Sequence, residues 1–498
     1  MMNYKGMEKI ACPLPVWKLD ADQDSWREIA RDCAESDGRL VALWGSAAGE
    51  KFLVHAALVF AEGMLIATCP AEDSFPGLED LFFHASRMQR AIFDLCGVMS
   101  RGGDRRPWLD HGKWQDFPLG RQRLQKPVPP ESDYPFVSVE GEGVHEIAVG
   151  PVHAGIIEPG HFRFQVVGEK VLRLEERLGY KHKGIEKAFE GLSFVEGNAL
   201  AGRISGDSTV AFSWAYAMAA EAVCRLTVSE RASLLRGIFL ERERIANHLG
   251  DLGALGNDAG FSFGLAQFST LKEEMLRANK TLFGHRYLMD RIVPGGVSCD
   301  LDDSGREMLR EEAGKLRRKV RDLREIYMDH TGLQDRFMTT GRVGAALAAR
   351  LGLSGLAGRA SGICRDLRAD HPAPPYAGLA FTKACERGGD VAARVLVRFG
   401  EIESSLDLCL AMLEKIGPGE ILAELPMASG FGAGWVEGFR GEVFVAVEAE
   451  AGILRRVHAH DPSWQNWPVL EHAVIGNIVP DFPLINKSFN LSYSGHDL

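Results

Sequence analysis

Acidic, imidazole and guanidinium groups lie close together in one short segment, which contains Glu158, His161 and Arg163. Such a group can hold or move a proton, or bind an anionic headgroup. The same residues also make ordinary salt-bridged turns, so both interpretations stay open at this point. The charged segment Gly179–Lys187 also allows two interpretations, because it equally suits the solvated start of a helix.

Two further segments place serine beside glycine, aspartate or proline. One runs from Arg203 to Ser208 and the other from His460 to Asn466. Serines in this company usually cap helices or form turns. A nucleophilic serine needs a positioned base, and neither Ser205 nor Ser463 lies in a Gly-x-Ser-x-Gly turn. A stand-alone hydrolase is therefore disfavoured.

The elements that must position these groups change along the chain. From about Trp17 to Leu124, short apolar runs at 40–44 and 52–54 predict strands, and 78–96 predicts a helix. This mixture indicates a small α+β domain. A proline-rich segment follows, with four prolines between positions 127 and 135, which excludes helix and favours an extended linker.

The rest of the chain is mostly of helical character. Apolar runs at 147–151 and 162–170 predict a hairpin, and from about Gly184 to Ile416 apolar residues recur with a spacing of three to four. This periodicity indicates a helical bundle. The predicted helices are Trp214–Leu226, Ala232–Leu249, Leu265–Leu282 and Arg306–Tyr327. A short strand at 441–447 precedes a C-terminal segment that contains prolines and is predicted to be irregular.

Composition bounds the class of protein. The chain has 498 residues, of which 46% are hydrophobic and 25% charged, with a formal net charge of −11. These values are typical of a globular protein of two or three domains and argue against nucleic acid as the main partner. No apolar stretch approaches the ~20 residues that cross a bilayer, and Met1–Lys9 lacks the apolar core of a signal peptide. We therefore expect a cytoplasmic protein.

Nine cysteines are scattered along the chain, and no two are closer than 21 positions. This spacing matches neither a zinc site nor an iron–sulfur site. We expect the cysteines to be buried apolar residues in a reducing compartment. Any metal or cluster that the protein uses must come from another chain or from oxygen and nitrogen ligands.

Several motifs, spread from Gly150 to the C-terminus, resemble one family in the right order. They are Gly150–His153, Glu158–Arg163, Gly179–Lys187, Glu241–Leu249, Pro294–Val297 and Glu437–Gly441. The chain resembles the large subunit of membrane-bound nickel–iron hydrogenases of group 4, which includes the formate hydrogenlyase and hydrogenase-4 types. More distantly, it resembles the quinone-site subunit of respiratory complex I.

The N-terminal part resembles the companion subunit that is fused ahead of this one in the family. The matching segments are Ala85–Val98, Asp104–Arg106 and Phe117–Leu119. The resemblance implies a docking domain like the complex I 30-kilodalton subunit over 1–125 and a linker over 126–145. A mainly α-helical domain with small β-hairpins, like the complex I 49-kilodalton subunit, is implied over 146–498.

The sequence departs from the hydrogenases at the metal site. The family holds nickel and iron with four thiolates, and the resemblance aligns those positions with Ser205, Ser208, Ser463 and Asn466. Hydroxyl and amide groups are hard, neutral ligands that do not bridge two transition metals at neutral pH. We therefore expect no nickel–iron centre and no metal bound by this chain.

Complex I suggests a quinone in the space that the metal leaves. The quinone tyrosine of that family falls near Gly206 or Asp207, so this ligand is missing, and the hairpin histidine is His153 or His161. Arg203 matches an arginine beside the terminal iron–sulfur cluster of a neighbouring subunit. The histidine that bonds this cluster in complex I aligns with Leu288.

The resemblance implies a polar cavity around the altered site. Its expected catalytic residues are Glu158, His161, Arg203, Asp207 and Arg440, and its expected binding residues are His153, His161, Arg203 and Asp461. Buried carboxylates, imidazole and guanidinium have shifted proton affinities, which suits proton-coupled electron transfer. The alternative is a closed cavity in a catalytically inactive scaffold.

The resemblance also implies partners. The expected protein is a peripheral-arm subunit on the cytoplasmic face of a bacterial membrane, which passes electrons from an iron–sulfur small subunit to quinone or another small acceptor. It is expected to dock hydrogenase-4-like or complex I-like membrane subunits, including antiporter-like ones, with a formate or NADH dehydrogenase module as a candidate donor. The scaffold alternative keeps the same partners without electron transfer.

Overall fold

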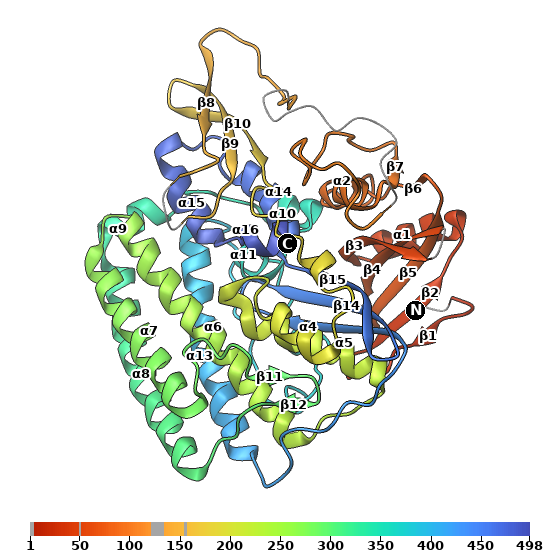
Figure 1. The fold of residues 1–498 in the computed structure, drawn as a ribbon. Helices are drawn as coiled ribbons and strands as arrows, with labels where there is room; N and C mark the ends of the chain where they lie inside the picture. Colours follow the sequence, from red (N-terminus) through yellow and green to blue (C-terminus); the bar gives the residue numbers. More distant parts are fainter. Residues whose placement is uncertain (1–3, 49–50, 121–133, 154–156) are drawn as a thin grey trace.

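The N-terminal part forms a five-stranded sheet with two helices. The computed structural model describes residues 4–48, 51–120, 134–153 and 157–498. In this sheet the strand order is β1-β2-β5-β4-β3; β2 and β5 are parallel and the other pairs are antiparallel. The elements are β1 (Glu8–Lys9), β2 (Val16–Asp20), α1 (Gln23–Glu35), β3 (Arg39–Ala48), β4 (Lys51–Phe60), β5 (Gly63–Ala71) and α2 (Ala85–Cys96), as Figure 1 shows. The strands predicted at 40–44 and 52–54 are confirmed within β3 and β4.

The helix predicted over 78–96 begins only at Ala85. Residues 78–84 form short turns instead, and two side-chain hydrogen bonds anchor them to neighbouring segments. The amide of Leu78 donates to Oε1 of Gln89 at 2.6 Å, and Nε2 of His84 lies 2.9 Å from the carbonyl oxygen of Leu40. A small parallel pair, β6 (Ser74–Pro76) and β7 (Met99–Arg101), flanks this region.

Both faces of the N-terminal sheet are covered. Alternate residues of a strand point to opposite faces. On one face, Leu43 packs with Ile92 of α2. On the other face, Trp44 belongs to a cluster from the later part of the chain, and its ring centroid lies 5.6 Å from that of Phe444. The first part of the chain therefore shares a hydrophobic core with the rest.

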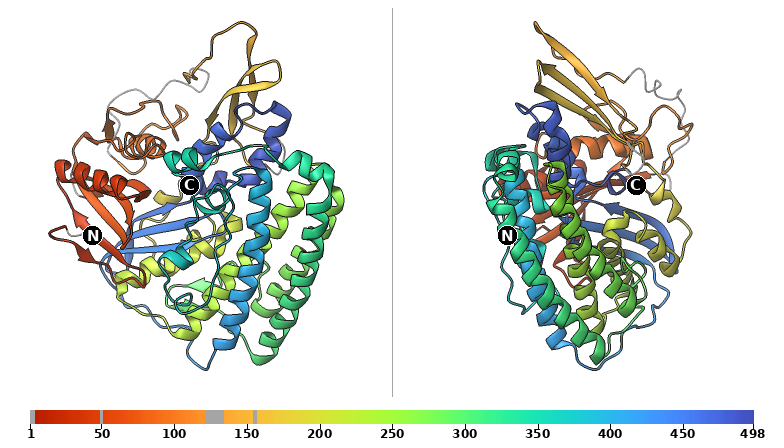
Figure 2. Two further views of the ribbon diagram at one scale, coloured as in Figure 1. Left: turned by 180° about the vertical axis from the view of Figure 1, so that it is seen from behind. Right: turned by 90° about the vertical axis from the view of Figure 1, so that its left-hand side faces the viewer.

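A three-stranded antiparallel sheet, in the order β10-β9-β8, projects from the body, as both views in Figure 2 show. Its strands are β8 (Val144–Val149), β9 (His161–Val167) and β10 (Lys170–Arg177). The predicted hairpin is thus confirmed, with a third strand added. Of the predicted linker, 126–133 lies outside the described residues, and Val144 already belongs to β8. The division into 1–125, 126–145 and 146–498 stays a prediction.

The body is a helical bundle, which confirms the predicted fold class. Its long helices are α5 (Thr209–Cys224), α6 (Glu230–Asp258), α7 (Ser262–Phe283), α8 (Asp303–Asp329) and α13 (Val391–Lys415). The first four contain most or all of the predicted helices. Shorter elements are α3 (Ile185–Ala188), α4 (Phe194–Ala201), the 3-10 turn η2 (Gly206–Ser208), β11 (Ile292–Val293), β12 (Gly296–Val297), α9 (Thr331–Phe337), α10 (Ala345–Leu351), α11 (Gly355–Ala360) and α12 (Leu367–Asp370).

A second antiparallel sheet, in the order β13-β14-β15, lies between α5 and the N-terminal sheet. Its strands are β13 (Gly430–Glu437), β14 (Glu442–Glu450) and β15 (Ile453–His460), of which the sequence pattern predicts only β14. Glycines let β13 approach α5 closely. A Cβ at Gly432 would lie 2.1 Å from the carbonyl oxygen of Ala219, and one at Gly434 would lie 1.9 Å from that of Ala215.

The prediction of an irregular C-terminus is wrong. Helices α14 (Ser463–Ala473), α15 (Phe482–Phe489) and α16 (Tyr493–Asp497) follow β15, with the 3-10 turn η3 (Val479–Asp481) between the first two. Pro483 lies in the first turn of α15, where a helix needs no amide donor. Pro468 lies within α14, which continues past it. Prolines therefore do not exclude helix here.

The cysteines depart partly from the expectation. Cys33, Cys69, Cys96 and Cys409 are buried thiols, as predicted. Cys364 and Cys385 instead form a disulfide, and Cys364 is exposed. In the part of the chain that the structure describes, no helix is long and apolar enough to cross a membrane.

Candidate functional site

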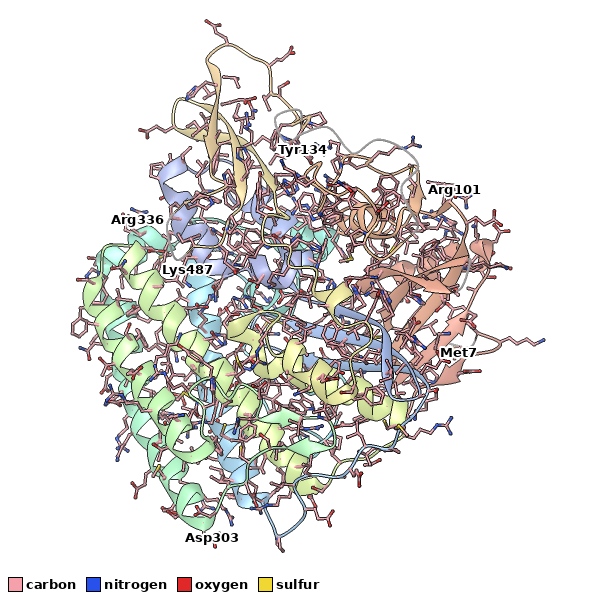
Figure 3. All side chains as sticks on the ribbon, in the orientation of Figure 1. Met7, Arg101, Tyr134, Asp303, Arg336 and Lys487 are labelled. Atoms are coloured by element: carbon pink, nitrogen blue, oxygen red, sulfur yellow. A yellow bond between two sulfur atoms is a disulfide. The ribbon has the colours of Figure 1, made fainter. Side chains whose placement is uncertain are left out.

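A cavity of about 720 Å³ lies between the β8–β9 connection and the C-terminal helices. We refer to it as the hairpin cavity. Lys487, on its rim, lies below the β8–β10 sheet in Figure 3. The lining comprises Val149, His153, Ile157, Glu158, Phe162, Ser205, Gly206, Asp207, Asp258, Arg440, Phe482, Pro483, Asn486, Lys487, Asn490, Leu491, Ser492, Tyr493 and Ser494. Apolar walls with a few converging polar groups are typical of small-molecule sites.

An ion pair forms one wall of the hairpin cavity. Nη1 of Arg440 donates to Oδ1 of Asp207 at 2.9 Å, and Nη2 donates to Oδ2. Arg440 is fixed from behind, because its Nε donates to the carbonyl oxygen of Asn490. The surrounding protein opposes ionisation of Asp207, but Arg440 outweighs this effect and lowers the pKa of Asp207 to about 2. The cavity therefore carries a fixed carboxylate at neutral pH.

Serine hydroxyls meet beside this ion pair. Oγ of Ser205 donates to Oδ1 of Asp207 at 2.8 Å and lies 2.8 Å from Oγ of Ser492. The amide of Ser492 donates to Oγ of Ser463 at 2.9 Å, and Oγ of Ser208 accepts from Arg440 at 3.1 Å. Three of the four positions that the family resemblance aligns with thiolates thus meet at one place.

Asn466, the fourth position, bonds the backbone of a neighbouring segment. Its Oδ1 accepts from the amide of Ser354 at 3.0 Å, and its Nδ2 donates to the carbonyl oxygen of Ser354 at 3.3 Å. Because the hydroxyls and this amide are hydrogen-bonded within the protein and are hard ligands, they do not fit a nickel–iron centre. Among the described residues, no three His, Cys, Asp or Glu side chains form a metal-binding group.

Asp461 lies behind the hairpin cavity. Its Oδ1 accepts from the amide of Ser463 at 2.8 Å. Its Oδ2 is buried and has no hydrogen-bond partner among the described residues. Burial raises the pKa of Asp461, and Arg440 opposes this shift only in part.

Glu158 connects the hairpin to the C-terminal helix α16. Its carboxylate accepts from both the amide and the hydroxyl of Ser494, the former at 3.0 Å. Nζ of Lys181 lies 3.8 Å from Oε1 of Glu158. Glu158 therefore closes the hairpin onto α16 and still faces the hairpin cavity.

The two hairpin histidines differ in position. His153 lines the hairpin cavity, and its Nε2 lies 2.8 Å from the carbonyl oxygen of Gly160. His161 lies outside the lining, as far as the described residues go, and both its ring nitrogens are engaged. Its Nδ1 lies 3.3 Å from the carbonyl oxygen of Gly150, and its Nε2 accepts from Arg163 at 3.3 Å. Burial lowers the pKa of His161, so its ring is neutral at pH 7.

Arg203 is on the surface, apart from the described lining of the hairpin cavity. It pairs in a bidentate manner with Asp290, with both N–O distances 2.9 Å. The two side chains keep 46% and 39% of their surface exposed. Of the seven residues expected at the altered site, the structure thus places His153, Glu158, Asp207 and Arg440 in the described lining, and His161, Arg203 and Asp461 outside it.

Comparisons with known proteins agree with the residue motifs. A family model described as the 49 kDa subunit of respiratory-chain NADH dehydrogenase matches residues 258–430. Formate hydrogenlyase subunit 5 of Escherichia coli K12 is 31% identical over 422 residues, which cover 82% of this chain and 74% of that protein. The chain belongs to the complex I 49 kDa and nickel–iron hydrogenase large-subunit family.

Other members of the family extend the comparison. An NADH-quinone oxidoreductase subunit of Phocaeicola vulgatus, of the C/D type, is 26% identical, over 75% of this chain and 77% of that protein. A solved structure of the membrane-bound sulfane sulfur reductase, an archaeal respiratory membrane complex, superposes with a TM-score of 0.67 and 25% identity. It covers 72% of this chain and 99% of that chain. The family thus includes members named for different acceptors.

Sequence reasoning missed part of the site in this family member. Asn486, Asn490, Ser492 and Tyr493 all line the hairpin cavity from the C-terminal segment. The sequence contains a polar run within 486–495 that indicates these residues, but the prolines of the C-terminal segment favoured a prediction of irregular structure.

Glu243 is a second residue whose role was missed, although it lies within one of the family motifs. Its carboxyl accepts from the amides of Val210 and Ala211 at 2.6 and 3.1 Å, at the start of α5. Burial raises the pKa of Glu243 to about 8, against the effect of these two amides. A carboxyl that holds its proton at neutral pH therefore lies near Asp207.

Proposed function

We propose that this chain is the large subunit of the peripheral arm of a membrane-bound oxidoreductase related to complex I and hydrogenase-4. In this proposal, two electrons from an iron–sulfur partner and two protons reduce a quinone, or another small acceptor, to its hydrogenated form in the hairpin cavity. The observation that carries the proposal is a cavity of about 720 Å³ with Asp207, Arg440 and Glu158 in its wall. Electron transfer would be coupled to ion movement in the membrane partners.

We propose further that the chain works without a nickel–iron centre. Ser205, Ser208 and Ser463 carry hydroxyls where the resemblance aligns thiolates, and their oxygens bond Asp207, Arg440 and Ser492. A hydroxyl remains protonated at neutral pH and is a poor ligand for soft metals. Stoichiometric nickel in the purified protein would contradict this part of the proposal.

Each cavity wall has a role in the proposed binding of the acceptor. The apolar side chains of Phe162, Phe482 and Leu491 suit a quinone ring or its tail. The hydroxyl of Tyr493 is a donor in the same lining, in place of the missing family tyrosine, and Nδ1 of His153 is an acceptor there because Nε2–H donates to Gly160. The exposed pair of Arg203 and Asp290 would face the iron–sulfur subunit.

The alternative is a catalytically inactive scaffold that joins the iron–sulfur subunit to the membrane arm. Two cavity variants, Tyr493→Phe and Glu158→Gln, separate the two proposals. Glu146→Gln is the matched control, because this exposed carboxylate lies on β8, ahead of the connection that carries Glu158, and pairs with Arg163 at 2.9 Å, outside the described cavity lining. A redox site predicts that the cavity variants lose at least about tenfold in rate in an intact complex. Full activity in both would support the scaffold.

The first experiment is affinity purification of the tagged chain from native membranes in mild detergent, with all chains and metals identified. Recovery with an iron–sulfur subunit and antiporter-like subunits, with iron and without nickel, is the expected result. The complex is then assayed with reduced methyl viologen as donor and with a short-chain ubiquinone, a menaquinone analogue or polysulfide as acceptor. Recovery of the chain alone from the soluble fraction would overturn the proposal.

A further inference from the structure

A second cavity, of about 490 Å³, lies between the N-terminal sheet and the body. Residues 37–41 line it from the N-terminal side, and residues 348–355 with Glu437 and Glu442 line it from the body. It is open to solvent, because the Asp37 side chain on its rim keeps 95% of its surface exposed. The hairpin cavity and this second cavity share no lining residue.

A series of buried charged side chains begins at the second cavity. Oε1 of Glu437 accepts from Nη1 of Arg359 at 2.8 Å, and Oε1 of Glu401 accepts from Nε of the same guanidinium at 2.7 Å. Oε2 of Glu401 lies 2.7 Å from Nε2 of His248. Glu437 is 3% exposed, and the other three side chains are fully buried.

The series continues from His248 to the hairpin cavity. Asp251 lies three residues further along α6, so the two side chains occupy the same helix face. Oδ1 of Asp251 accepts from Nδ2 of Asn490 at 2.9 Å, and Nζ of Lys487 lies 3.3 Å away. Asn490 and Lys487 both line the hairpin cavity.

Two atoms in this series are buried without a hydrogen-bond partner among the described residues. They are Nη2 of Arg359 and Nδ1 of His248. Buried polar atoms are almost always hydrogen-bonded, to protein or to ordered water. The first atom belongs to the guanidinium that binds both Glu437 and Glu401, and the second belongs to the residue that precedes Asp251 in the series. One water at each atom would make the series continuous.

We propose that the buried series from Glu437 through Glu401, His248 and Asp251 to Lys487 exchanges protons between the second cavity and the hairpin cavity, by way of two bound waters. The inference rests on the proposed function, because reduction of an acceptor requires protons. An acceptor that fills the hairpin cavity displaces water from it, so protons must reach the acceptor by a separate path through the protein.

The proton steps balance at each atom. Burial lowers the pKa of His248, so the ring is neutral, and when Nε2–H donates to Glu401 the free lone pair is on Nδ1. For outward movement, water gives a proton to Nδ1 while Nε2 passes its proton to Oε2 of Glu401. Inward movement uses the other tautomer, in which protonated Glu401 donates to Nε2 and Nδ1–H donates to water. The water passes a proton to Asp251, and Asp251 passes one to Lys487 after Lys487 has given its own proton to the acceptor. Arg359 stays charged and only holds the water between the two carboxylates.

Charged groups on α13 and on α6 itself influence the pKa of His248. Glu401 and Arg398 lie on α13, and Arg244 and Asp251 lie on α6 with it. The ring of Phe439, after β13, packs on His248 with centroids 6.2 Å apart. At the solvent end, burial raises the pKa of Glu437 to about 7, which lets it exchange protons near neutral pH.

His248→Gln tests the path in the purified complex, because glutamine still donates to Glu401 but does not titrate. With reduced methyl viologen and a short-chain ubiquinone, we expect kcat to fall at least about tenfold, with KM for quinone unchanged and a larger solvent isotope effect. Imidazole in the buffer should restore part of the rate. The matched control is Glu221→Gln, another buried carboxylate, which is bonded to Nη1 of Arg236 at 3.0 Å and, among the described residues, has no partner in common with the path. We expect it to stay within about twofold of the wild type in an intact complex.

Equal losses in His248→Gln and Glu221→Gln, or no loss in His248→Gln, would overturn the path. A second measurement does not depend on the acceptor. A high-resolution cryo-electron microscopy map of the complex should contain ordered water within hydrogen-bond distance of Nη2 of Arg359 and of Nδ1 of His248. Absence of either water would overturn the path even if the complex reduces quinone. Failure of the wild-type complex to reduce any acceptor would overturn the proposed function, and the map would then decide whether the path exists.

Discussion

Single residues in this protein owe their chemistry to what surrounds them. Asp207 keeps a pKa of about 2 because of Arg440, while Glu243, which accepts from two backbone amides, has its pKa raised to about 8 by burial. Two carboxyls close to one cavity thus differ in charge at neutral pH. Such a difference is typical of sites that separate the roles of acid and base.

Removal of Arg440 should be costly. In Arg440→Met, Asp207 and the carbonyl oxygen of Asn490 lose their charged partner, and we expect a loss of about 2–3 kcal/mol, below the value for a fully enclosed pair because Asp207 is 39% exposed. Urea unfolding measures this loss. Arg203→Met is the matched control, because its pair with Asp290 is on the surface and is expected to contribute at most about 1 kcal/mol. Equal losses would contradict the assignment of Arg440 to the cavity wall.

Glu243 should make stability depend on pH. Its pKa rises from 4.5 to about 8 on folding, so the folded state holds the proton more tightly. This contribution is fully present below about pH 4.5 and is lost as pH rises through 8, by up to about 1.4 kcal/mol per unit. Glu243→Gln stays neutral, so the variant should gain stability relative to the wild type between pH 5 and pH 8. Parallel urea-unfolding curves for the two proteins across this range would refute the shift.

At the scale of elements, the periodic spacing of apolar residues predicted the long helices and some of the strands. The helices α5 to α8 were found from their helix-forming residues and apolar spacing; α8 buries one face over many turns, whereas α5 is buried on nearly all sides. The strands β13 and β15 were missed, since glycines at 430, 432 and 434 and charges at 455 and 456 hide their alternation. The C-terminal helices were missed because prolines such as Pro468 and Pro483 usually interrupt a helix.

The site itself was predictable only in part, for a physical reason. Glu158, Asp207 and Arg440 were expected from the family resemblance and do line the cavity. Ser205 and Ser492, however, are 287 positions apart and meet only through the tertiary fold. Local pattern carries no information about such contacts.

The close packing of β13 on α5 gives a prediction at this scale. Gly434→Ala would place a Cβ 1.9 Å from the carbonyl oxygen of Ala215, so backbone must move, and we expect a loss of about 2–3 kcal/mol. Thermal and urea unfolding check this value. Gly417→Ala is the control, because nothing lies within 4 Å of the added carbon. We expect it to be neutral or to stabilise the fold by up to about 1 kcal/mol; a similar loss in both would argue against the close approach.

At the scale of the whole molecule, the N-terminal sheet and the body are joined by a shared interior. Val16, Trp44 and Ile66 from the sheet belong to the same buried cluster as Phe444 and Leu454 from the body. Separation of the N-terminal sheet from the body would therefore expose apolar surface on both parts.

Residues 146–498 expressed alone should therefore bind a hydrophobic dye and aggregate, while residues 1–125 expressed with them in the same cell should rescue solubility and co-purify. Size-exclusion chromatography with dye fluorescence measures both outcomes. A soluble, compact 146–498 fragment that does not bind dye would show that the shared cluster contributes little.

The shared interior also has a kinetic consequence for assembly. When two separate chains must find each other, the rate at which they associate falls with dilution and their ratio depends on synthesis. Here, the sheet and the body are one chain, so Trp44 meets Phe444 in a first-order step whose rate does not depend on how much protein the cell makes. Each copy of the body therefore carries one copy of the sheet, and the stoichiometry of this pair is fixed by covalent structure before any partner arrives.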